Sequence, residues 1–404
     1  MTSIDTNLAG FSSERLTRVS RLLQGYVDRG DIAGIIARVG RRGQVAYHER
    51  FGWMDREALK PMRDDTIFMI ASMTKPVTAV AAMMLYEEGR FDLNTPIKKF
   101  IPAFADTKVF AGENDSGMIL AAPDRDITFR HLFTHSAGLS YGWNPDSPVD
   151  RAYRAVEKSM ADAGIPRTNA RVAEELAKLP LAFQPGTRWG YSMSIDLLGG
   201  LVEILSGQTL DVFCEERIFK PLGMPDTGFF LPPEKAERRA IVYGEMTAVR
   251  GRRRLDEMTP PAARPSYISG GGGLVSTVED YSRFAGMLTD GGQVDGVRLL
   301  APSTMALFSL NQLAPGVKLI GMDPRDPRHA GYGYSLGTRV LVDVAESGCA
   351  GNAGEFGWDG AFNTYFWIDP AEDLYGLLLM QHHPFGEYPI HREFKQTVYQ
   401  ALVG

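Results

Sequence analysis

Residues 70–76 read Ile70-Ala71-Ser72-Met73-Thr74-Lys75-Pro76, and an apolar segment with helical spacing follows them. Gly89 ends a segment whose apolar side chains recur three and four residues apart, at Val77, Val80, Ala81, Met84 and Leu85. Proline is accepted without a kink only in a first helical turn, so Pro76 limits the helix start to the neighbourhood of Ser72. The sequence therefore predicts Ser72 at the beginning of a helix with a buried face.

Lys75 follows Ser72 by three residues, so the two side chains are expected on one helix face with Cβ atoms about 5–6 Å apart. A serine hydroxyl becomes a nucleophile when a base removes its proton, and a lysine amine can be that base. Unpaired N–H groups at the helix start would stabilise an oxyanion. No other serine in the chain has a lysine at this distance. The residues also fit a helix-capping serine beside a solvated lysine, and this stretch alone leaves both interpretations open.

The length and net charge of the chain limit the classes of function that this protein can have. With 404 residues the chain is long enough for two domains or for one domain with a large insertion. A formal net charge of −6 argues against nucleic acid as a partner, and the basic cluster at residues 250–254 is expected to be a solvated hairpin or loop. The first residues lack a signal-peptide pattern and no stretch approaches a membrane span, so we expect a soluble cytoplasmic protein without a membrane partner. Cys214 and Cys349 are expected to be buried thiols rather than a disulfide.

Strand signals occur at both ends of the chain, with helical signals between them. The expected strands cover residues 33–39, 44–51, 334–342, 361–368 and 374–380, and the first two form a hairpin. The main expected helices cover residues 16–27, 77–88, 128–133, 194–205, 276–291 and 388–403, with Ser276 and Glu279 as a capping box. This order predicts an α/β (α+β) fold: one sheet interrupted by a large helical insertion. We assign residues 1–76 and 266–404 to a discontinuous sheet domain and residues 77–265 to a mainly helical inserted domain, with the active site at their interface.

Two later stretches carry further candidate site residues. Tyr191 lies in a glycine-flanked loop before a predicted helix, where its phenol can reach Ser72 as a proton shuttle or as a partner of Lys75. Residues 357–361 read Gly357-Trp358-Asp359-Gly360-Ala361 and lead into a predicted sheet-edge strand. Such a strand can direct one N–H at a substrate carbonyl, which together with the Ser72 N–H would form an oxyanion hole.

Together the three stretches resemble the serine β-lactamase and penicillin-binding-protein superfamily, whose pattern is Ser-x-x-Lys, a Tyr or Ser element, and a Lys/His/Trp-x-Gly strand motif. Residues 132–139, 221–227 and 271–280 look like the connecting motifs of its class C branch, so the resemblance runs from about Leu16 to the C-terminus. Within that branch the chain is most similar to the family VIII carboxylesterases.

The resemblance implies a β-lactamase/transpeptidase-like fold, in which an antiparallel sheet is flanked by helices. It makes Ser72 the nucleophile, Lys75 and Tyr191 the coupled general base and acid, and the N–H groups of Ser72 and Ala361 the oxyanion hole. Trp358 stands where β-lactamases usually carry lysine. We expect no cofactor and no metal ion.

Two departures from the family pattern bear on the substrate. Class C enzymes have Tyr-x-Asn, but the third position here is Met193, which cannot hydrogen-bond a substrate amide. Trp358 stands in place of a lysine, whose cation would bind a β-lactam carboxylate, and offers an aromatic wall instead. Both changes favour neutral, apolar esters. Gly360, Tyr141 and Trp143 complete the predicted substrate site, although Tyr141 and Trp143 equally fit plain packing.

Other patterns compete with this interpretation. Ser140 and Ser335 each lie in a Gly-x-Ser-x-Gly sequence typical of α/β-hydrolases, but neither has the required preceding strand and following helix. His131 and His135 are four residues apart without the glutamate of a zinc protease helix, so structural roles are favoured. His329 with Gly331 imitates a His-x-Gly motif in a loop-like context. Residues 270–273 lack the lysine of a phosphate-binding loop.

The sequence thus predicts a serine carboxylesterase that cleaves small esters with short to medium acyl chains through an acyl-enzyme. Promiscuous β-lactam hydrolysis is compatible with it. The alternatives of the same fold are a class C-like β-lactamase or D-amino peptidase, a small-amide hydrolase and an acyltransferase. A non-catalytic ligand-binding protein is the alternative of a different class. The sequence does not predict the oligomeric state.

Overall fold

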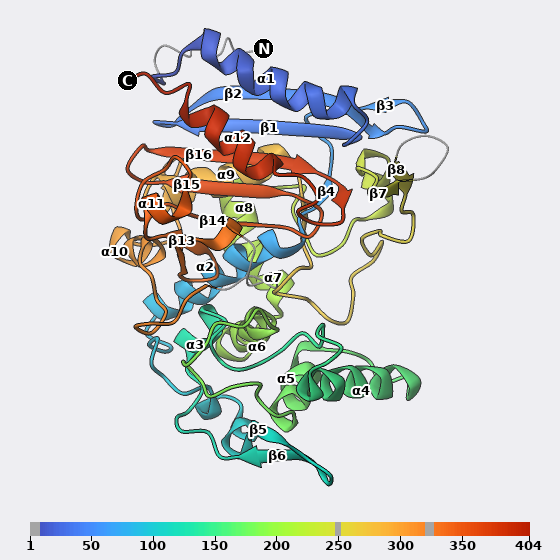
Figure 1. The fold of residues 1–404 in the computed structure, drawn as a ribbon, viewed down its shortest axis with the longest axis vertical. Coiled ribbons are helices and arrows are strands. Elements are labelled where there is room, and N and C mark those ends of the chain that lie inside the picture. The colour runs from blue at the N-terminus through green and yellow to red at the C-terminus, as the bar shows by residue number, and fades with distance from the viewer. Residues whose placement is uncertain (1–8, 247–251, 320–326) are drawn as a thin grey trace.

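The centre of the fold is an eight-stranded antiparallel sheet to which both ends of the chain contribute (Figure 1). The structure, a computed structural model, describes residues 9–246, 252–319 and 327–404. In spatial order the strands are β12 (Tyr332–Tyr334), β13 (Arg339–Leu341), β14 (Phe356–Asp359), β15 (Tyr365–Asp369), β16 (Leu374–Met380), β1 (Gly34–Arg41), β2 (Gln44–Asp55) and β3 (Lys60–Pro61). The expected antiparallel sheet is confirmed.

The N-terminal hairpin joins the C-terminal strands through β1. Ile36 of β1 lies opposite Leu379 of β16 on one side and opposite Arg50 of β2 on the other. Successive strand residues point to opposite faces of a sheet, so the buried neighbours Ile35 and Ile36 enter two different hydrophobic cores. The hairpin predicted over residues 33–51 is confirmed.

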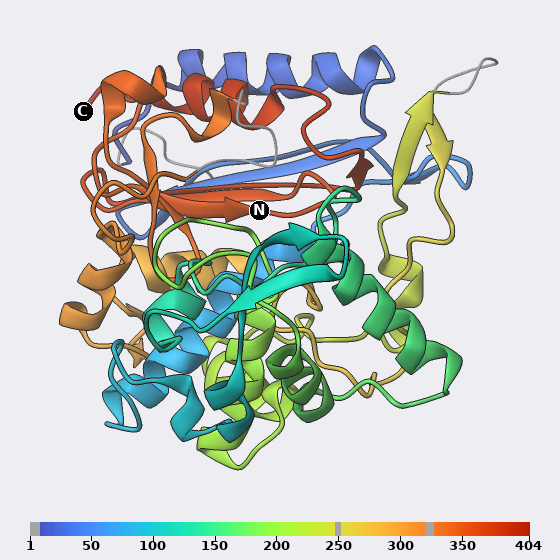
Figure 2. The same cartoon turned by 60° about the horizontal axis from the view of Figure 1, so that its bottom comes forward.

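Helices cover both faces of the sheet. α1 (Ser13–Asp28) and α12 (Ile390–Tyr399) lie side by side on one face, and Figure 2 shows them above the sheet with most other helices below it. Ser12 caps α1 by accepting a hydrogen bond from the N–H of Arg15 at 3.3 Å. The side of α1 that faces the sheet buries Leu16, Val19, Leu23 and Tyr26. α9 (Val278–Thr289) packs against the opposite face.

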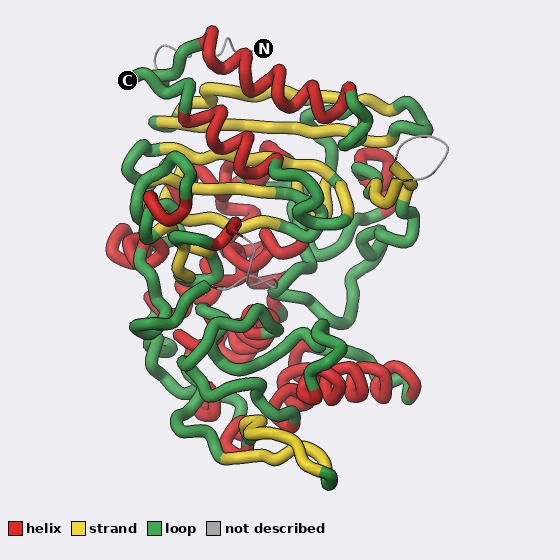
Figure 3. The backbone as a smooth tube through the Cα atoms, viewed as in Figure 1, coloured by secondary structure: helices red, strands yellow, loops and turns green. Residues whose placement is uncertain are grey.

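The middle of the chain is mainly helical, as predicted (Figure 3). Its helices are α2 (Thr74–Glu87), α3 (Phe129–Phe133), α4 (Pro148–Asp162), α5 (Asn169–Lys178), α6 (Ser194–Ser206), α7 (Leu210–Cys214) and α8 (Lys220–Leu222). Two short helices come later in the chain, α10 (Pro302–Ala306) and α11 (Val344–Ser347). The small strand pairs are β4 (Phe68–Met69) with β9 (Val275–Ser276), β5 (Val109–Asn114) with β6 (Gly117–Ala121), and β10 (Gln293–Val294) with β11 (Val297–Arg298). β7 (Tyr243–Met246) lies between β8 (Arg252–Arg254) and β17 (His382–His383). The proposed division into two domains stays a prediction.

Several predicted boundaries are wrong. The strand expected over residues 334–342 is two strands, because Gly337 adopts φ +75° and turns the chain between β12 and β13. The strand expected over residues 361–368 starts only at Tyr365, and Trp358 belongs to the preceding strand β14, inside the sheet rather than at its edge. Asn363 at φ +64° lies in the turn that separates the two strands. The final helix is also shorter than expected, as α12 covers only residues 390–399.

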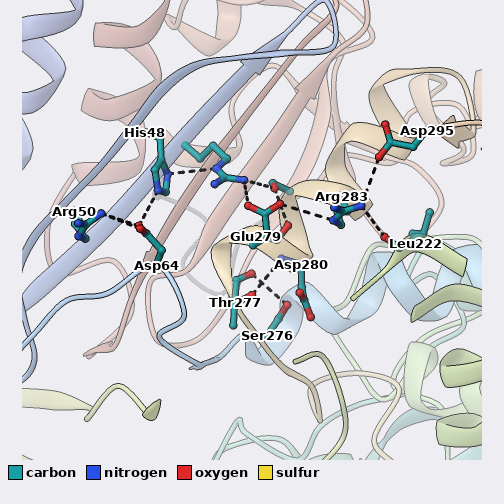
Figure 4. Close-up of polar contacts among 12 residues, drawn as sticks. His48, Arg50, Asp64, Leu222, Ser276, Thr277, Glu279, Asp280, Arg283 and Asp295 are labelled. Carbon is teal, nitrogen blue, oxygen red and sulfur yellow. Dashed lines mark hydrogen bonds and ion pairs between the residues drawn. The ribbon is translucent and has the colours of Figure 1, made fainter. Parts of the chain in front are cut away.

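The cap of α9 is Thr277, not Ser276. The Thr277 side chain accepts a hydrogen bond from the N–H of Asp280 at 3.2 Å, while the Ser276 hydroxyl is paired with Thr227 at 2.8 Å. The neighbouring residue Glu279 instead binds Arg38 of β1 at 2.6 Å, and the same arginine contacts His48 at 3.3 Å. Figure 4 shows this chain of polar contacts, which fixes α9 against the sheet.

The basic cluster falls partly outside the described residues. Arg250 and Gly251 are not described, whereas residues 252–254 form β8 of a small hairpin with β7, as expected. Within the described chain, no single helix combines the length and hydropathy of a membrane span; residues 194–206 and 210–222 reach them only together, across an 80° bend. Cys214 is buried, but Cys349 is half-buried, so the expectation of two buried thiols holds for one of them.

Candidate active site

Ser72 lies in a 3₁₀ turn, Ala71–Met73, that runs directly into α2. Ala71 adopts φ +44°, an uncommon conformation for a residue with a Cβ, and so turns the chain just before the serine. The Met73 carbonyl accepts a hydrogen bond from the buried Tyr281 hydroxyl of α9 at 2.9 Å. The predicted position of Ser72 at a helix start is confirmed, with the refinement that a tighter turn comes first.

Lys75 reaches back to Ser72 from the first turn of α2. Its Nζ atom lies 3.2 Å from Ser72 Oγ and 2.6 Å from the carbonyl oxygen of Gly271. The side chain is 1% exposed and makes no ion pair with any carboxylate of the described residues. The ring of Tyr191 lies 4.5 Å from the same nitrogen. The solvated lysine of the alternative interpretation is therefore excluded, and Lys75 is placed to exchange a proton with Ser72.

Tyr191 approaches Ser72 from the loop that precedes α6. Its hydroxyl donates to Ser72 Oγ at 2.7 Å and accepts from the indole Nε1–H of Trp358 at 3.4 Å. Trp358 is 4% exposed and packs behind the Tyr191 ring, with a centroid separation of 5.7 Å. We expected Trp358 as an aromatic wall of the substrate site; in the structure it is buried and supports the phenol, and its contact with substrate stays a prediction.

His135 packs on the other side of Tyr191, with ring centroids 4.8 Å apart. Its Nδ1 atom accepts from the N–H of Ser192 at 3.3 Å. Burial, with the nearby Lys75 cation, holds the pKa of His135 well below its usual range, so the ring is neutral. His131 has a different role: its Nδ1 accepts from the N–H of Thr128 and completes a capping box for α3. The structural roles predicted for both histidines agree with these contacts.

Asp196 was not identified from the sequence, yet it organises the loop behind Lys75. This buried carboxylate accepts hydrogen bonds from the hydroxyls of Tyr141 at 3.1 Å, Tyr267 at 2.7 Å and Ser269 at 2.6 Å, and from the N–H of Gly271 at 3.1 Å. Burial and the carboxylate raise the pKa of Tyr141 well above its usual range, so this phenol remains a donor. The sequence feature that could have identified Asp196 is that it is a single carboxylate in the mainly apolar first turns of α6.

The predicted oxyanion donors lie on two elements that the structure brings together. The Thr364 hydroxyl donates to the Ile70 carbonyl at 3.3 Å, which ties the turn after β14 to the segment before Ser72. A Cβ at Gly360 would lie 2.4 Å from the same carbonyl oxygen, so only glycine fits there. In the described chain, the N–H groups of Ser72 and Ala361 make no hydrogen bond, and Ala361 is exposed. Their joint role as an oxyanion hole stays a prediction.

A largely apolar cavity of about 280 Å³ lies beside Tyr141 and Met193, between α4 and α5. Its other walls include Tyr153, Val156, Met160, Ile165 and Leu176. Trp143 is 57% exposed and stacks on Tyr141 with a centroid separation of 4.4 Å. Pockets of this kind hold apolar groups of small ligands. The structure therefore brings two of the predicted substrate residues, Tyr141 and Met193, to one cavity.

The family described as Beta-lactamase matches residues 19–398. The chain belongs to the beta-lactamase family. It is 37% identical to Protein Rv1367c of Mycobacterium tuberculosis over 88% of both chains, and 30% identical to Esterase EstB of Burkholderia gladioli over 94% of both. Its fold is similar to Simvastatin Synthase (LovD) from Aspergillus terreus, with a TM-score of 0.83 and 25% identity over 97% of this chain and 100% of the other. The predicted superfamily and fold are thereby confirmed, and relatives in this family include both esterases and acyltransferases.

The competing serines lie outside this beta-lactamase-family site and have structural partners. The Ser335 hydroxyl is buried and donates to the Leu307 carbonyl at 3.0 Å. Ser140 donates to Asp150 Oδ1 at 2.7 Å. Neither hydroxyl contacts a histidine in the described chain, so neither forms the nucleophile–base pair that an α/β-hydrolase needs. His329 lies in a short 3₁₀ turn and not on a strand of the site.

Proposed function

We propose that this protein is a carboxylesterase that cleaves neutral, apolar esters through an acyl-enzyme on Ser72. The observation that carries the proposal is the convergence of Lys75 Nζ, at 3.2 Å, and the Tyr191 hydroxyl, at 2.7 Å, on one serine oxygen. A nucleophile within hydrogen-bond reach of two proton-exchanging groups is the arrangement that acyl transfer requires. The esterases among the relatives support the same reaction class.

In the proposed reaction, Ser72 Oγ attacks the ester carbonyl while the Lys75 and Tyr191 pair removes its proton. The N–H groups of Ser72 and Ala361 stabilise the oxyanion. The pair then returns the proton to the leaving alcohol, and water releases the acid from the serine by the reverse steps. Because coupled groups titrate together, the base is assigned to the pair and not to one member.

The substrate preference is inferred from what the site can and cannot bind. Trp358 carries no charge where a β-lactam carboxylate would meet a lysine, and its indole N–H is already directed at Tyr191. Met193 offers no hydrogen bond to a substrate amide, and it borders the apolar cavity of about 280 Å³. Burying the methylene groups of an acyl chain there contributes about 0.8 kcal/mol for each one. These features favour short to medium acyl esters over anionic β-lactams.

An acyltransferase of the same mechanism is the second candidate. In that case a second alcohol, rather than water, would take the acyl group from Ser72. The relatives named as acyltransferases favour keeping this alternative. Product analysis with p-nitrophenyl butyrate and increasing alcohol separates the two, because a transferase forms the new ester at alcohol concentrations where a hydrolase still releases butyric acid.

The deciding experiment is a paired turnover assay with p-nitrophenyl butyrate and a chromogenic cephalosporin. Wild type, Ser72→Ala and the matched control Ser335→Ala are prepared side by side. We expect fast ester cleavage in the wild type, little cephalosporin turnover, loss of ester cleavage in Ser72→Ala and its retention in Ser335→Ala. Dominant cephalosporin turnover would show a β-lactamase, and esterase activity that survives Ser72→Ala would show that the nucleophile is assigned wrongly.

A further inference from the structure

A second cavity lies on the face of the sheet that α12 covers, away from Ser72. Its volume is about 590 Å³, and its walls come from the strands β12 to β15, the loop before α12 and α12 itself. Trp358 and Asp359 are successive residues of β14 and therefore point to opposite faces. Trp358 supports Tyr191, whereas Asp359 lines the second cavity. The two sites thus share a strand but no lining residue.

Three arginines line this cavity: Arg328, Arg339 and Arg392. Arg339 is 9% exposed and uses Nη1 to bind Asp359 at 2.6 Å, but within the described chain its other nitrogens have no hydrogen-bond partner and are not sealed from solvent. The rings of Tyr332 and Tyr365 lie 5.5 and 5.3 Å from its guanidinium carbon and hold it in place. Arg392 of α12 donates from Nη2 to the carbonyls of Ser347 and Gly348, each at 3.1 Å.

Among the described residues that line the cavity, the cations Arg328, Arg339, Arg392 and Lys395 outnumber the carboxylates Asp359 and Glu387. Arg392 forms no ion pair with any carboxylate of the described residues. The two carboxylates that line the cavity are already bound, Asp359 to Arg339 and Glu387 to His382 at 2.9 Å. Lys395, a further lining cation, is paired with Glu355 behind the wall at 2.5 Å. The guanidinium groups therefore have donors left over for an incoming anion.

Aromatic groups also line the cavity. His391 donates from Nε2 to the Asn363 carbonyl at 2.9 Å and stacks on Tyr365 with a centroid separation of 4.6 Å. The Tyr365 hydroxyl makes no hydrogen bond in the described part of the chain and is not sealed from solvent. Flat ring faces beside forked N–H donors suit a planar carboxylate attached to an apolar body, and the volume is in the range of small-molecule sites.

We propose that this cavity is a binding site for a small organic carboxylate, separate from the esterase centre. The carboxylate lies between Arg339 and Arg392, and the body of the ligand lies against the rings of Tyr365 and Tyr332. Guanidinium is the preferred partner of a carboxylate because its N–H groups match both oxygens. The inference goes beyond the proposed function and does not depend on it.

The test is calorimetric titration with benzoate, its neutral isostere benzamide, and inorganic phosphate. The protein is wild type with Ser72 blocked by a fluorophosphonate, and mass spectrometry establishes the block. We expect benzoate to bind, benzamide and phosphate to bind at least tenfold more weakly, and Arg392→Gln to weaken benzoate at least tenfold. Asp359→Asn, which releases Arg339 from its ion pair, is expected to strengthen the binding of benzoate. The matched control Arg50→Gln removes an arginine on β2 and is expected to change nothing.

Four outcomes would overturn the proposal: no benzoate binding, equal binding of benzamide, preferred binding of phosphate, or benzoate binding that Arg392→Gln leaves intact. Benzoate that binds free enzyme but not the blocked enzyme occupies the Ser72 site and also overturns it. Arg392→Lys guards against misfolding, because it keeps the charge but loses the fork and should bind benzoate with intermediate strength. A failure of the esterase proposal shows separately, as absent labelling and absent ester turnover.

Discussion

The Nζ atom of Lys75 lies closer to the carbonyl oxygen of Gly271, at 2.6 Å, than to the oxygen of Ser72, at 3.2 Å. Lys75, the proposed proton acceptor of Ser72, is therefore oriented by a backbone group of a distant loop. That loop is fixed in turn by Asp196, which accepts the N–H of Gly271 at 3.1 Å. A single residue, Gly271, thus connects the buried carboxylate to the Lys75 amine through its N–H and its carbonyl group, and the first prediction below tests this connection.

Asp196→Ala should lower kcat/KM for p-nitrophenyl butyrate at least tenfold. The change leaves buried donors of Tyr141, Tyr267 and Gly271 without their acceptor, which costs about 1–3 kcal/mol for each group left unsatisfied. Urea unfolding measures that loss, and kinetics on the folded fraction measure the displacement of Lys75. Tyr267→Phe is the matched control, because it removes one donor and keeps the carboxylate. If Asp196→Ala is destabilised but keeps wild-type kcat, the loop does not position the lysine.

Tyr191→Phe should lower kcat by about 10²–10⁴-fold, the usual range for loss of a general acid–base group. The ring keeps its packing against Trp358 and His135, so the free energy of unfolding should change little. Single-turnover kinetics with p-nitrophenyl butyrate separate acylation from deacylation. Trp358→Phe, which removes the indole donor to the phenol and part of the packing behind its ring, should have a smaller effect on kcat. Equal activity of Tyr191→Phe and wild type would remove the phenol from the reaction.

Val156→Trp should shorten the acyl chain that the enzyme accepts. Val156 of α4 lines the apolar cavity beside Tyr141, so an indole there fills the space proposed for the chain. We expect p-nitrophenyl acetate turnover to be unchanged and octanoate turnover to fall at least tenfold. Val212→Trp, at a 39% exposed position of α7, is the matched control and should leave the chain-length profile intact. An unchanged profile in Val156→Trp would place the acyl chain elsewhere.

Asp280 should make the protein less stable as the pH rises. Burial raises its pKa from 3.8 to about 6, although the N–H of Asp226 and the Thr227 hydroxyl donate to it at 2.7 and 2.9 Å. Because the folded-state pKa is the higher one, the protonated form favours folding. This contribution to stability is complete below the unfolded pKa near 3.8 and is lost as the pH rises through about 6.

Asp280→Asn imitates the protonated carboxyl at every pH. We expect it to be more stable than wild type at pH 8, by about 3 kcal/mol for a shift of this size, and nearly equal to it at pH 4. Urea denaturation at both pH values measures the difference. A difference that is the same at pH 4 and pH 8 would show that Asp280 does not titrate in this range.

Local rules made the first two candidate residues predictable. Helix geometry fixes the distance between residues three apart, so Ser72 and Lys75 were expected on one helix face once a helix began there. The strand pattern of residues 33–51 likewise predicted the N-terminal hairpin, which the structure places in the sheet. Tyr191 and residues 357–361 were candidates because of their loop and strand context, and their roles came from the order of motifs in a known superfamily, which carries tertiary information that periodicity lacks.

Contacts between distant segments could not be predicted in this way. The donors to Asp196 are 55 to 75 residues away along the chain, and nothing in the apolar helix around it indicates which loops will reach it. Trp358 was expected beside the substrate because it stands where β-lactamases usually carry lysine, and its strand was expected at the sheet edge. Its position within β14 depends on the hairpin of β12 and β13, which Gly337 creates by turning a run that looked continuous.

The pairing of β1 with β16 also limits how early the protein can fold during its synthesis. Ser72 is synthesised early, but Tyr191, Gly271 and Trp358 each follow it by more than a hundred residues. One edge of β1 stays unpaired until β16 has been synthesised. Such long-range pairing is slow and leaves strand edges exposed meanwhile. On the ribosome, the nascent chain therefore carries Ser72 and Lys75 long before Gly271 and Trp358 have emerged, so a complete site reports that most of the chain has folded.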